Sequence, residues 1–450
     1  MKKIILSSLL PVSSLMCIAP ALTSCSANNK IVLANFESYM STDLINKYGK
    51  NVDFLYYQTN EEVESKYQKY YDLAIPSTYE VITLLKNKWV GKINWSRFDL
   101  HDADNHLITN GTQALSLFTD NIRNIIAQST DKYSDIFAPG ENLLDYCIPY
   151  FLQSFTFAYK GKEITELTNA TNWDKYTNVI GDKTNPDLPD VFKPMRTNHI
   201  ACVDDGRTFY SLCNLIKNQK LNPNNPKEWK INPDSETKSI SEFKNEYQYL
   251  TNKFSENHFY FNTDSQVILQ SLSTPKDGNL SAFAYNGDIL YAAMGAELYD
   301  PYYPDNFHIE NFDAKPLSVD ALVISNKNDK NPQKLNEIYD FVKAMFVDHV
   351  DSKQISDTDE DGNFLYDPMT NFDFVRYTSP FKSIDNYVVN GNYFLDVDET
   401  LSKDQIKLYK DIYNIKINPE VNIIDLIEAP LSNLCKSNMH WAYVEERQKI

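Results

Sequence analysis

The chain has 450 residues, with 61 acidic against 43 basic side chains and a formal net charge of −18 at pH 7. This length allows two or three domains with sizeable cores. The acidic balance argues against nucleic acid as a partner and is compatible with a cationic ligand.

The N-terminus predicts a secreted, lipid-anchored protein. Residues 1–24 carry two lysines, then a mostly apolar stretch interrupted by Pro11 and Pro20, then small residues, which is the layout of a signal peptide rather than a spanning helix. The sequence "LTSC" is similar to a bacterial lipobox, so we expect Cys25 to become the lipidated first residue, with a tether over residues 25–29. An ordinary cleaved signal with an incidental cysteine is the alternative. Because no later segment has about 18 uninterrupted apolar residues, we expect the protein to lie on the extracellular face of the cell membrane.

The first part of the chain alternates strand-like and helix-like segments. Apolar, β-prone runs predict strands over 31–36, 52–57 and 72–75, and periodic segments with capping residues predict helices over 41–49, 60–71 and 79–90. This alternation indicates right-handed crossovers onto a mainly parallel sheet. In such sheets a ligand lies outside the carboxyl ends of the strands, where this chain has "NFESY" (35–39) and "PSTY" (76–79).

A second α/β region follows. Residues 146–162 alternate apolar and polar side chains and are expected to cross from one lobe to another, whereas residues 163–200 are expected to form loops. We expect further strands over 280–285 and 318–325, and helices over 204–216, 264–272, 286–295 and 331–346. The acidic tail from residue 347 is expected to be irregular, with helical stretches near 402–414 and 439–448.

The sequence offers little sign of catalysis. It lacks the GxGxxG, GxxxxGK[ST], HExxH and GxSxG motifs, and no set of nucleophile, base and orienting group stands out, so we do not expect an enzyme. The histidine pair in 101–106 is expected to lie in a solvated loop. The acidic run 357–362 begins like a calcium loop, but Pro368 stands where an EF-hand needs a glutamate, which leaves only a looser calcium site open.

Six stretches together resemble the spermidine/putrescine-binding proteins of bacterial ABC importers. They occur in the order of that family and cover roughly residues 30–385: "ANFESYMSTDLINKYG", "YDLAIPSTYEV", "YCIPYFLQSFTFAYKGK", "VDDGRTFYSL", "FAYNGDILYA" and "SVDALVIS". On these motifs the chain is similar to a mollicute-like solute-binding lipoprotein of this family. The resemblance implies a type II periplasmic-binding-protein fold, in which two α/β lobes joined by a hinge close on one ligand.

The resemblance also implies a domain organisation. Lobe 1 would comprise residues 30–150 and 316–385, lobe 2 residues 151–315, and residues 386–450 would form C-terminal helices packed on the lobes. The family further implies a monomer without a cofactor, which passes a small cationic solute to an ABC permease in the membrane.

The site residues implied by the resemblance fit the chemistry of a polyamine. A linear polycation needs carboxylates for its ammonium groups and aromatic faces along its methylenes. The motifs supply carboxylates, hydroxyls and rings, and no catalytic residue or metal ligand is among them. The ligand-binding set is Phe36, Glu37, Ser38, Tyr39, Ser77, Thr78, Tyr79, Asp205, Tyr285, Asp320 and Tyr377.

Several of these positions depart from the family pattern. Phe36 and Tyr285 stand where the family has tryptophan, and Glu37 with Ser38 replaces threonine followed by glutamate. Thr208 replaces a glutamate that binds an amino group, and losing a buried carboxylate leaves one ammonium underpaired, at a cost of a few kcal/mol. Ser318 replaces a tryptophan beside Asp320. A shorter or singly charged amine, or another amine-bearing solute, therefore stays open.

The same residues also have structural alternatives. Ser77 and Thr78 can cap the following helix, Asp205 can be the N-cap of the helix that starts with "DDG", and the tyrosines can be core rings. Asp320 is the most informative residue, because an aspartate within an apolar strand must be paired if it is buried.

Two functions from different classes follow. The first is a solute-binding lipoprotein that closes on a polyamine-like cation such as spermidine or putrescine. The second is a surface lipoprotein of the same fold that binds a different solute, such as thiamine or ferric iron, or a host macromolecule. A cleft filled by its own side chains would favour the second.

Overall fold

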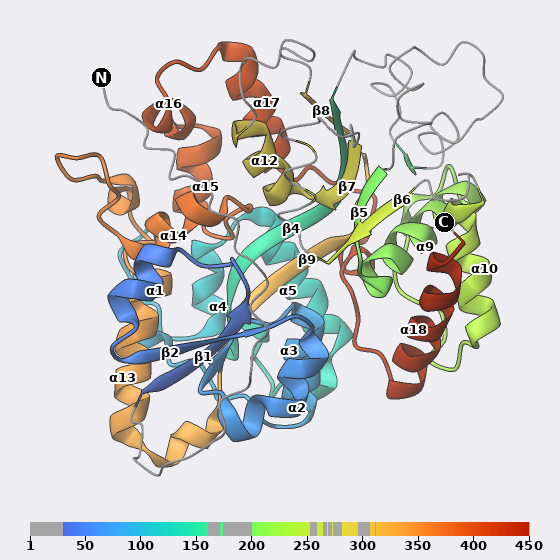
Figure 1. The fold of residues 1–450 in the computed structure, drawn as a ribbon. Helices are drawn as coiled ribbons and strands as arrows, with labels where there is room; N and C mark the ends of the chain where they lie inside the picture. Colours follow the sequence, from blue (N-terminus) through green and yellow to red (C-terminus); the bar gives the residue numbers. More distant parts are fainter. Residues whose placement is uncertain are drawn as a thin grey trace.

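The computed structural model describes residues 30–160, 172–173, 200–252, 259–263, 268, 272, 281–295, 307–310 and 312–449. The signal peptide, Cys25 and the tether lie outside the described residues, as do most of the expected loops over 163–200 and most of the helix expected over 264–272. The described residues form a mixed α/β structure (Figure 1).

The strands of the described residues form one sheet in the order β2-β1-β3-β9-β4-β7-β5-β6, with β8 paired to β4. β1 runs parallel to β2 and β3, and β5 runs parallel to β6 and β7, whereas β9 and β4 are antiparallel to their neighbours. The parallel sheet predicted from the sequence is thus present at the two ends but not at the centre. The strand bounds are β1 Ile31–Phe36, β2 Val52–Tyr57, β3 Leu73–Ala74, β4 Cys147–Lys160, β5 Ile200–Val203, β6 Phe259–Asn262, β7 Ser281–Tyr285, β8 Phe307–Ile309 and β9 Leu317–Ile324.

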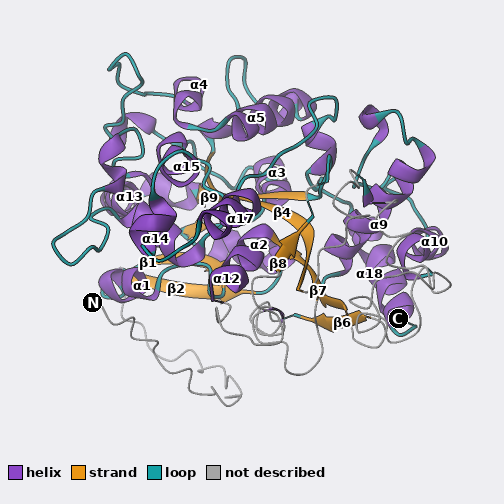
Figure 2. Ribbon diagram, turned by 90° about the horizontal axis from the view of Figure 1, so that it is seen from above, coloured by secondary structure: helices purple, strands orange, loops and turns teal. Residues whose placement is uncertain are grey.

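Strand β4 connects two lobes. Its residues 147–154 pair with β9, and its residues 155–159 pair with β7, so one strand passes from the sheet around β1–β3 into the sheet around β5–β7 (Figure 1). We call these the first and second lobe. All 14 residues of β4 are buried, and helices cover both sides of the strands (Figure 2). This arrangement confirms the expected two-lobe fold.

The helices of the first lobe pack around β1–β3. α13 contacts β1, α2 contacts β2 and α3, and α3 contacts β9. The bounds are α1 Thr42–Tyr48, α2 Asn60–Tyr70, α3 Thr78–Lys86, α4 Gly111–Ala114, α5 Asp120–Lys132 and α13 Pro332–Val342, the last followed by a π-helical turn at Lys343–Val347. The expected helices here end within a few residues of these bounds, because their apolar positions recur with the helical period.

The C-terminal part is more helical than predicted. Its helix α17 contacts α12 of the second lobe, and the turn Ile423–Leu426 contacts α5 of the first lobe. The last helix, α18, packs against α9 and α10 of the second lobe. The bounds are α9 Gly206–Leu221, α10 Ile240–Thr251, α12 Asn286–Gly295, α14 Asp367–Val375, α15 Lys382–Val389, α16 Tyr393–Val397, α17 Lys403–Tyr413 and α18 Asn433–Arg447. The short helices α14–α16 depend on tertiary packing, which local sequence patterns do not reveal.

Gly287, at the start of α12, allows the ring of Tyr377 to lie against this helix. A Cβ built on Gly287 would lie 1.5 Å from Cδ1 of Tyr377. We therefore expect Gly287→Ala to displace the Tyr377 ring and to lower the free energy of unfolding by about 1–3 kcal/mol, the usual cost of overpacking. Urea unfolding measures this change.

Gly91→Ala is the matched control, because the nearest atoms would lie 3.5 Å from its Cβ, at ordinary contact distance. Equal stabilities of the two variants would contradict the close packing of Tyr377 on α12.

Candidate ligand-binding cleft

Asp320, on β9, is the centre of a buried polar cluster. The residue is 2% exposed, and its carboxylate accepts hydrogen bonds from Ser77 Oγ at 2.7 Å, Tyr39 Oη at 2.8 Å and Gln153 Nε2 at 2.6 Å. Ser318 Oγ adds a longer contact of 3.4 Å. The buried acid is thus paired, as its place in an apolar strand predicted, and these partners are all neutral groups.

The start of α3 is attached to β9 next to this cluster. Ser77 and Asp320 form an isolated antiparallel bridge, and Thr78 Oγ1 donates to the carbonyl of Val319 at 2.6 Å. Ser77 occupies the N-cap position of α3, but its side chain makes no capping bond there. Its hydroxyl instead donates to Asp320, so the capping alternative is not what the structure shows.

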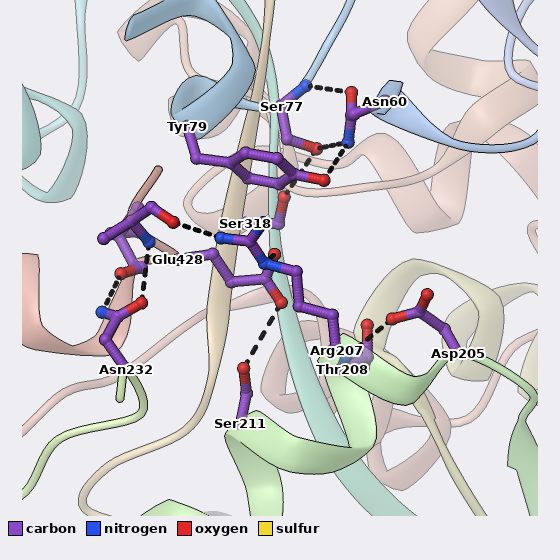
Figure 3. Close-up of polar contacts among 12 residues, drawn as sticks. Asn60, Ser77, Tyr79, Asp205, Arg207, Thr208, Ser211, Asn232, Ser318 and Glu428 are labelled. Carbon is purple, nitrogen blue, oxygen red and sulfur yellow. Dashed lines mark hydrogen bonds and ion pairs between the residues drawn. The ribbon is translucent and has the colours of Figure 1, made fainter. Parts of the chain in front are cut away.

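The ring of Tyr79 faces the second lobe. Asn60 donates to the Tyr79 hydroxyl at 2.9 Å and to Ser77 Oγ at 3.2 Å (Figure 3). The guanidinium carbon of Arg207, which comes from α9, lies 3.7 Å from the centre of the Tyr79 ring. Nε of Arg207 is 2.8 Å from a carboxylate oxygen of Glu428, which precedes α18. Side chains from both lobes and from the C-terminal part therefore meet at Tyr79.

Two further predicted tyrosines have polar partners in the second lobe. Tyr285 and Thr208 have their hydroxyls 3.1 Å apart. Tyr377 donates to Asp288 at 2.6 Å, and its ring centre lies 5.3 Å from that of Tyr39. The structure thus brings Tyr39, Ser77, Asp320 and Tyr377 together.

Four predicted residues lie at the edge of this group or outside it, and the ring centre of Phe36 is 6.1 Å from that of Tyr39. The ring of Phe36 packs on Tyr57, with ring centres 4.5 Å apart. Glu37 and Ser38 are exposed in the turn after β1, and Ser38 has a positive φ of 59°. Asp205 is exposed and accepts a bond of 2.6 Å from the N–H of the third residue of α9, so it is the N-cap of that helix. None of these four donates or accepts a hydrogen bond to Asp320 among the described contacts.

Burial raises the pKa of several carboxyl groups around the cleft. It raises the pKa of Asp320 to about 6, although the hydroxyl donors of Ser77 and Tyr39 oppose the shift. It raises the pKa of Glu428 to about 7 against the opposing charge of Arg207. The junction of the lobes therefore holds acids whose ionised form is disfavoured by burial and would be favoured by a bound cation.

Sequence reasoning missed Gln153, Arg207, Asp288 and Glu428. Gln153, Arg207 and Asp288 lie inside the quoted motifs but were not singled out. Glu428 stands in a stretch without helical or strand periodicity, and no local signal marked it.

The two acidic loops form turns. Asp102, Asp104 and His106 have ligand atoms within 4.8 Å of one another, but Asp102 accepts the backbone N–H groups of Asp104 and His106 at 2.9 Å. Asp359, in the run 357–362, accepts the N–H groups of residues 361 and 363 in the same way. Both carboxylates stabilise their own loops, and the looser calcium site that the sequence left open at 357–362 is not tested by these contacts.

Glu80, on α3, predicts a pH-dependent stability. Its carboxyl oxygens are buried without a hydrogen-bond partner among the described residues. Burial raises its pKa from 4.5 to about 8, and the nearby charge of Glu64 adds to the shift while Lys436 opposes it. Between pH 4.5 and about pH 8, Glu80 has lost its proton in the unfolded chain but keeps it in the folded protein. The free energy of unfolding therefore falls as pH rises, by about 1.4 kcal/mol per pH unit for one proton. We expect Glu80→Gln to reduce this slope, measured by urea unfolding between about pH 5 and pH 8.

Glu62→Gln on α2 is the control for this slope, since Glu62 is partly exposed and pairs with Lys66 at 3.1 Å. A slope that stays the same in Glu80→Gln would show that Glu80 is ionised in the folded protein at neutral pH.

Solved structures of solute-binding proteins share this fold. A protein of Listeria monocytogenes named for a spermidine/putrescine ABC transporter has 15% identity and a TM-score of 0.52, over 93% of this chain and 99% of that chain. The TpPotD lipoprotein of Treponema pallidum has 15% identity and a TM-score of 0.51, over 92% and 98%. A structure from Synechococcus named for an oligosaccharide periplasmic-binding protein has 8% identity and a TM-score of 0.51, over 93% of both chains. At these identities the likeness shows the fold and not the ligand.

The sequence comparisons give the family. No curated protein matches the chain. A model of a family described as hypothetical lipoproteins, the MG045 family, matches residues 1–409, which is most of the chain. The chain therefore belongs to the MG045 family of lipoproteins.

Proposed function

We propose that the protein is a lipid-anchored, extracellular solute-binding protein that closes on a polyamine-like cation and delivers it to an ABC permease. One observation carries this proposal: the carboxylate of Asp320 is buried among neutral donors, beside tyrosine rings that line the junction of the two lobes. An acid without a cationic partner and electron-rich ring faces are complementary to an organic cation.

The geometry of the rings supports a linear cation. Tyr39 and Tyr377 lie next to Asp320, whereas Tyr79 and Tyr285 contact residues of α9. Because rings from both lobes lie near the junction, one extended cation can contact both lobes at once. Its binding energy then favours the closed arrangement of the lobes. Each ring face contributes about 0.5–2 kcal/mol to cation binding.

The cellular location belongs to the same proposal. The leader and Cys25 would anchor the chain by one lipid, leaving both lobes in water outside the membrane. In the part of the chain that the structure describes, none of the helices combines the length and apolar character needed to span a bilayer. Capture and delivery of a solute require no catalytic group, and we propose no reaction.

A second candidate is the same fold with a different ligand, such as thiamine, ferric iron or a host macromolecule. The observation that favours it is that the side chains at the junction of the lobes already bind one another. Asp320 has four neutral donors, and Tyr79 is only 7% exposed beneath Arg207. Thr208, which stands where the family pattern has a carboxylate, also favours a different ligand.

Ligand-induced stabilisation distinguishes the two candidates. We expect putrescine, spermidine or spermine to raise the midpoint of thermal unfolding, by RT ln(1 + [L]/Kd) in free energy. Thermal-shift measurements should include thiamine and ferric salts in the same series. A response to thiamine or iron and to none of the amines would reject the polyamine and support the second candidate.

Asp320→Asn tests the carboxylate itself. The amide keeps the shape of the side chain but cannot pair with an ammonium group, so we expect the affinity for spermidine to fall at least about tenfold. Calorimetric titration well below the unfolding midpoint separates binding from stability.

Asp53→Asn is the matched control, because Asp53 on β2 is partly exposed and pairs only with Lys30 among the described ion pairs. Equal affinities of wild type and Asp320→Asn would remove Asp320 from the binding site.

A further inference from the structure

A cation of the protein itself lies on the ring that was expected to bind the solute. The guanidinium of Arg207, from the second lobe, stacks 3.7 Å from the centre of the Tyr79 ring of the first lobe (Figure 3). Tyr79 is 7% exposed in this arrangement. A second cation can reach that face of the ring only if Arg207 leaves it.

The C-terminal part of the chain supplies the acceptors for this guanidinium. Nε of Arg207 lies 2.8 Å from Glu428 Oε2, and Nη2 donates to the carbonyl of Ala429. Nη1 is buried and has no hydrogen-bond partner among the described residues. The carboxylate of Glu428 also accepts from Ser211 Oγ at 3.3 Å, one turn after Thr208 on α9.

The acceptors are held in place by their own contacts. Asn232 donates to the carbonyl of Ile427 and accepts from the N–H of Ala429, both at 2.7 Å. Ile427 also forms a parallel bridge with Leu317 at the start of β9. The backbone on both sides of Glu428 is therefore held by contacts that do not involve Arg207.

The surroundings of the guanidinium are acidic. Glu428, Glu61 and Asp205 interact electrostatically with Arg207. Lys436, which pairs with Glu64 at 3.5 Å, is a further cation near Glu80. Without the charge of Arg207 this region would hold a clear excess of carboxylates, which attracts cations.

We propose that the ring of Tyr79, the carboxylate of Glu428 and the carbonyl of Ala429 form a subsite for the cationic end of the solute, and that Arg207 occupies this subsite as an internal cation. The inference rests on the proposed function and deepens it. Glu428 would supply, from another segment, the carboxylate that is absent at Thr208. Binding would then be an exchange, in which the ammonium or guanidinium group of the solute displaces that of Arg207.

A small guanidinium salt tests this exchange. Arg207→Ala removes the internal cation and leaves its acceptors in place. We expect millimolar ethylguanidinium to raise the unfolding midpoint of Arg207→Ala by a few degrees, and to change that of the wild type by much less, because binding to the folded state alone stabilises it. In Arg207→Ala with Glu428→Gln, we expect ethylguanidinium to bind at least about tenfold more weakly.

Arg447→Ala is the matched control. Its guanidinium also pairs with a carboxylate, that of Asp204, and lies 5.7 Å from a ring centre, that of Phe261, but its side chain is 43% exposed. We expect no stabilisation of Arg447→Ala by ethylguanidinium. Equal responses of wild type, Arg207→Ala and Arg447→Ala would overturn the inference.

A second measurement covers the case in which Arg207→Ala does not fold. The affinity of Glu428→Gln for spermidine should fall about tenfold if Glu428 binds the solute, and an unchanged affinity would overturn the subsite while leaving the proposed function intact. Conversely, ethylguanidinium could stabilise Arg207→Ala while no polyamine stabilises the wild type. That result would support the subsite and reject a polyamine as the solute.

Discussion

A carboxylate is buried on β9, next to the strand β4 that joins the two lobes, and three segments of the chain supply the hydrogen bonds that its burial requires. Taking such a charge out of water costs several kcal/mol unless hydrogen bonds replace the lost solvent. Asp320 obtains them from the loop after β1, from the start of α3 and from β4, through Tyr39, Ser77 and Gln153. These elements are distant in sequence, so the requirement to satisfy one acid fixes their relative positions. It also leaves the acid without a cationic partner, because each donor is neutral.

The contact between the lobes has a different character. Tyr79 meets Arg207, and Lys436 meets Glu64, through a stacked guanidinium and a partly exposed ion pair. Such contacts are individually weak and are readily exchanged for contacts with a charged solute or with water. β4, buried along its whole length, provides the permanent connection. A buried strand with polar contacts beside it fits the proposed closure of the two lobes on a solute.

The sequence was sufficient wherever structure depends on local patterns. The strands at 31–36 and 52–57 were predicted to the residue, because β-branched and aromatic residues are bounded there by turn signals. Ser77 was correctly placed at the start of a helix, but the destination of its hydroxyl depends on Asp320, 243 residues away. The same limit applies to the antiparallel centre of the sheet, whose strands β3, β4 and β9 lie far apart in the chain. The short helices α14–α16 depend on packing against one another and against neighbouring turns, which no local pattern marked. The motifs identified Tyr79 and Asp320, but they did not identify Arg207, which covers the Tyr79 ring, or Gln153, which donates to Asp320.

Glu428 shows why a motif comparison can misjudge the charge of a binding site. The family pattern predicts a carboxylate at residue 208, and a comparison by position reports it as lost. In space, a carboxylate does lie against the same helix, hydrogen-bonded to Ser211 Oγ, but it is supplied by a segment beyond residue 409, where the family match ends. A ligand responds to the positions of charges and not to their order in the chain. The absence of a glutamate at Thr208 is therefore weaker grounds for a change of ligand than the position of Arg207, which places a cation directly on a ring expected to bind one.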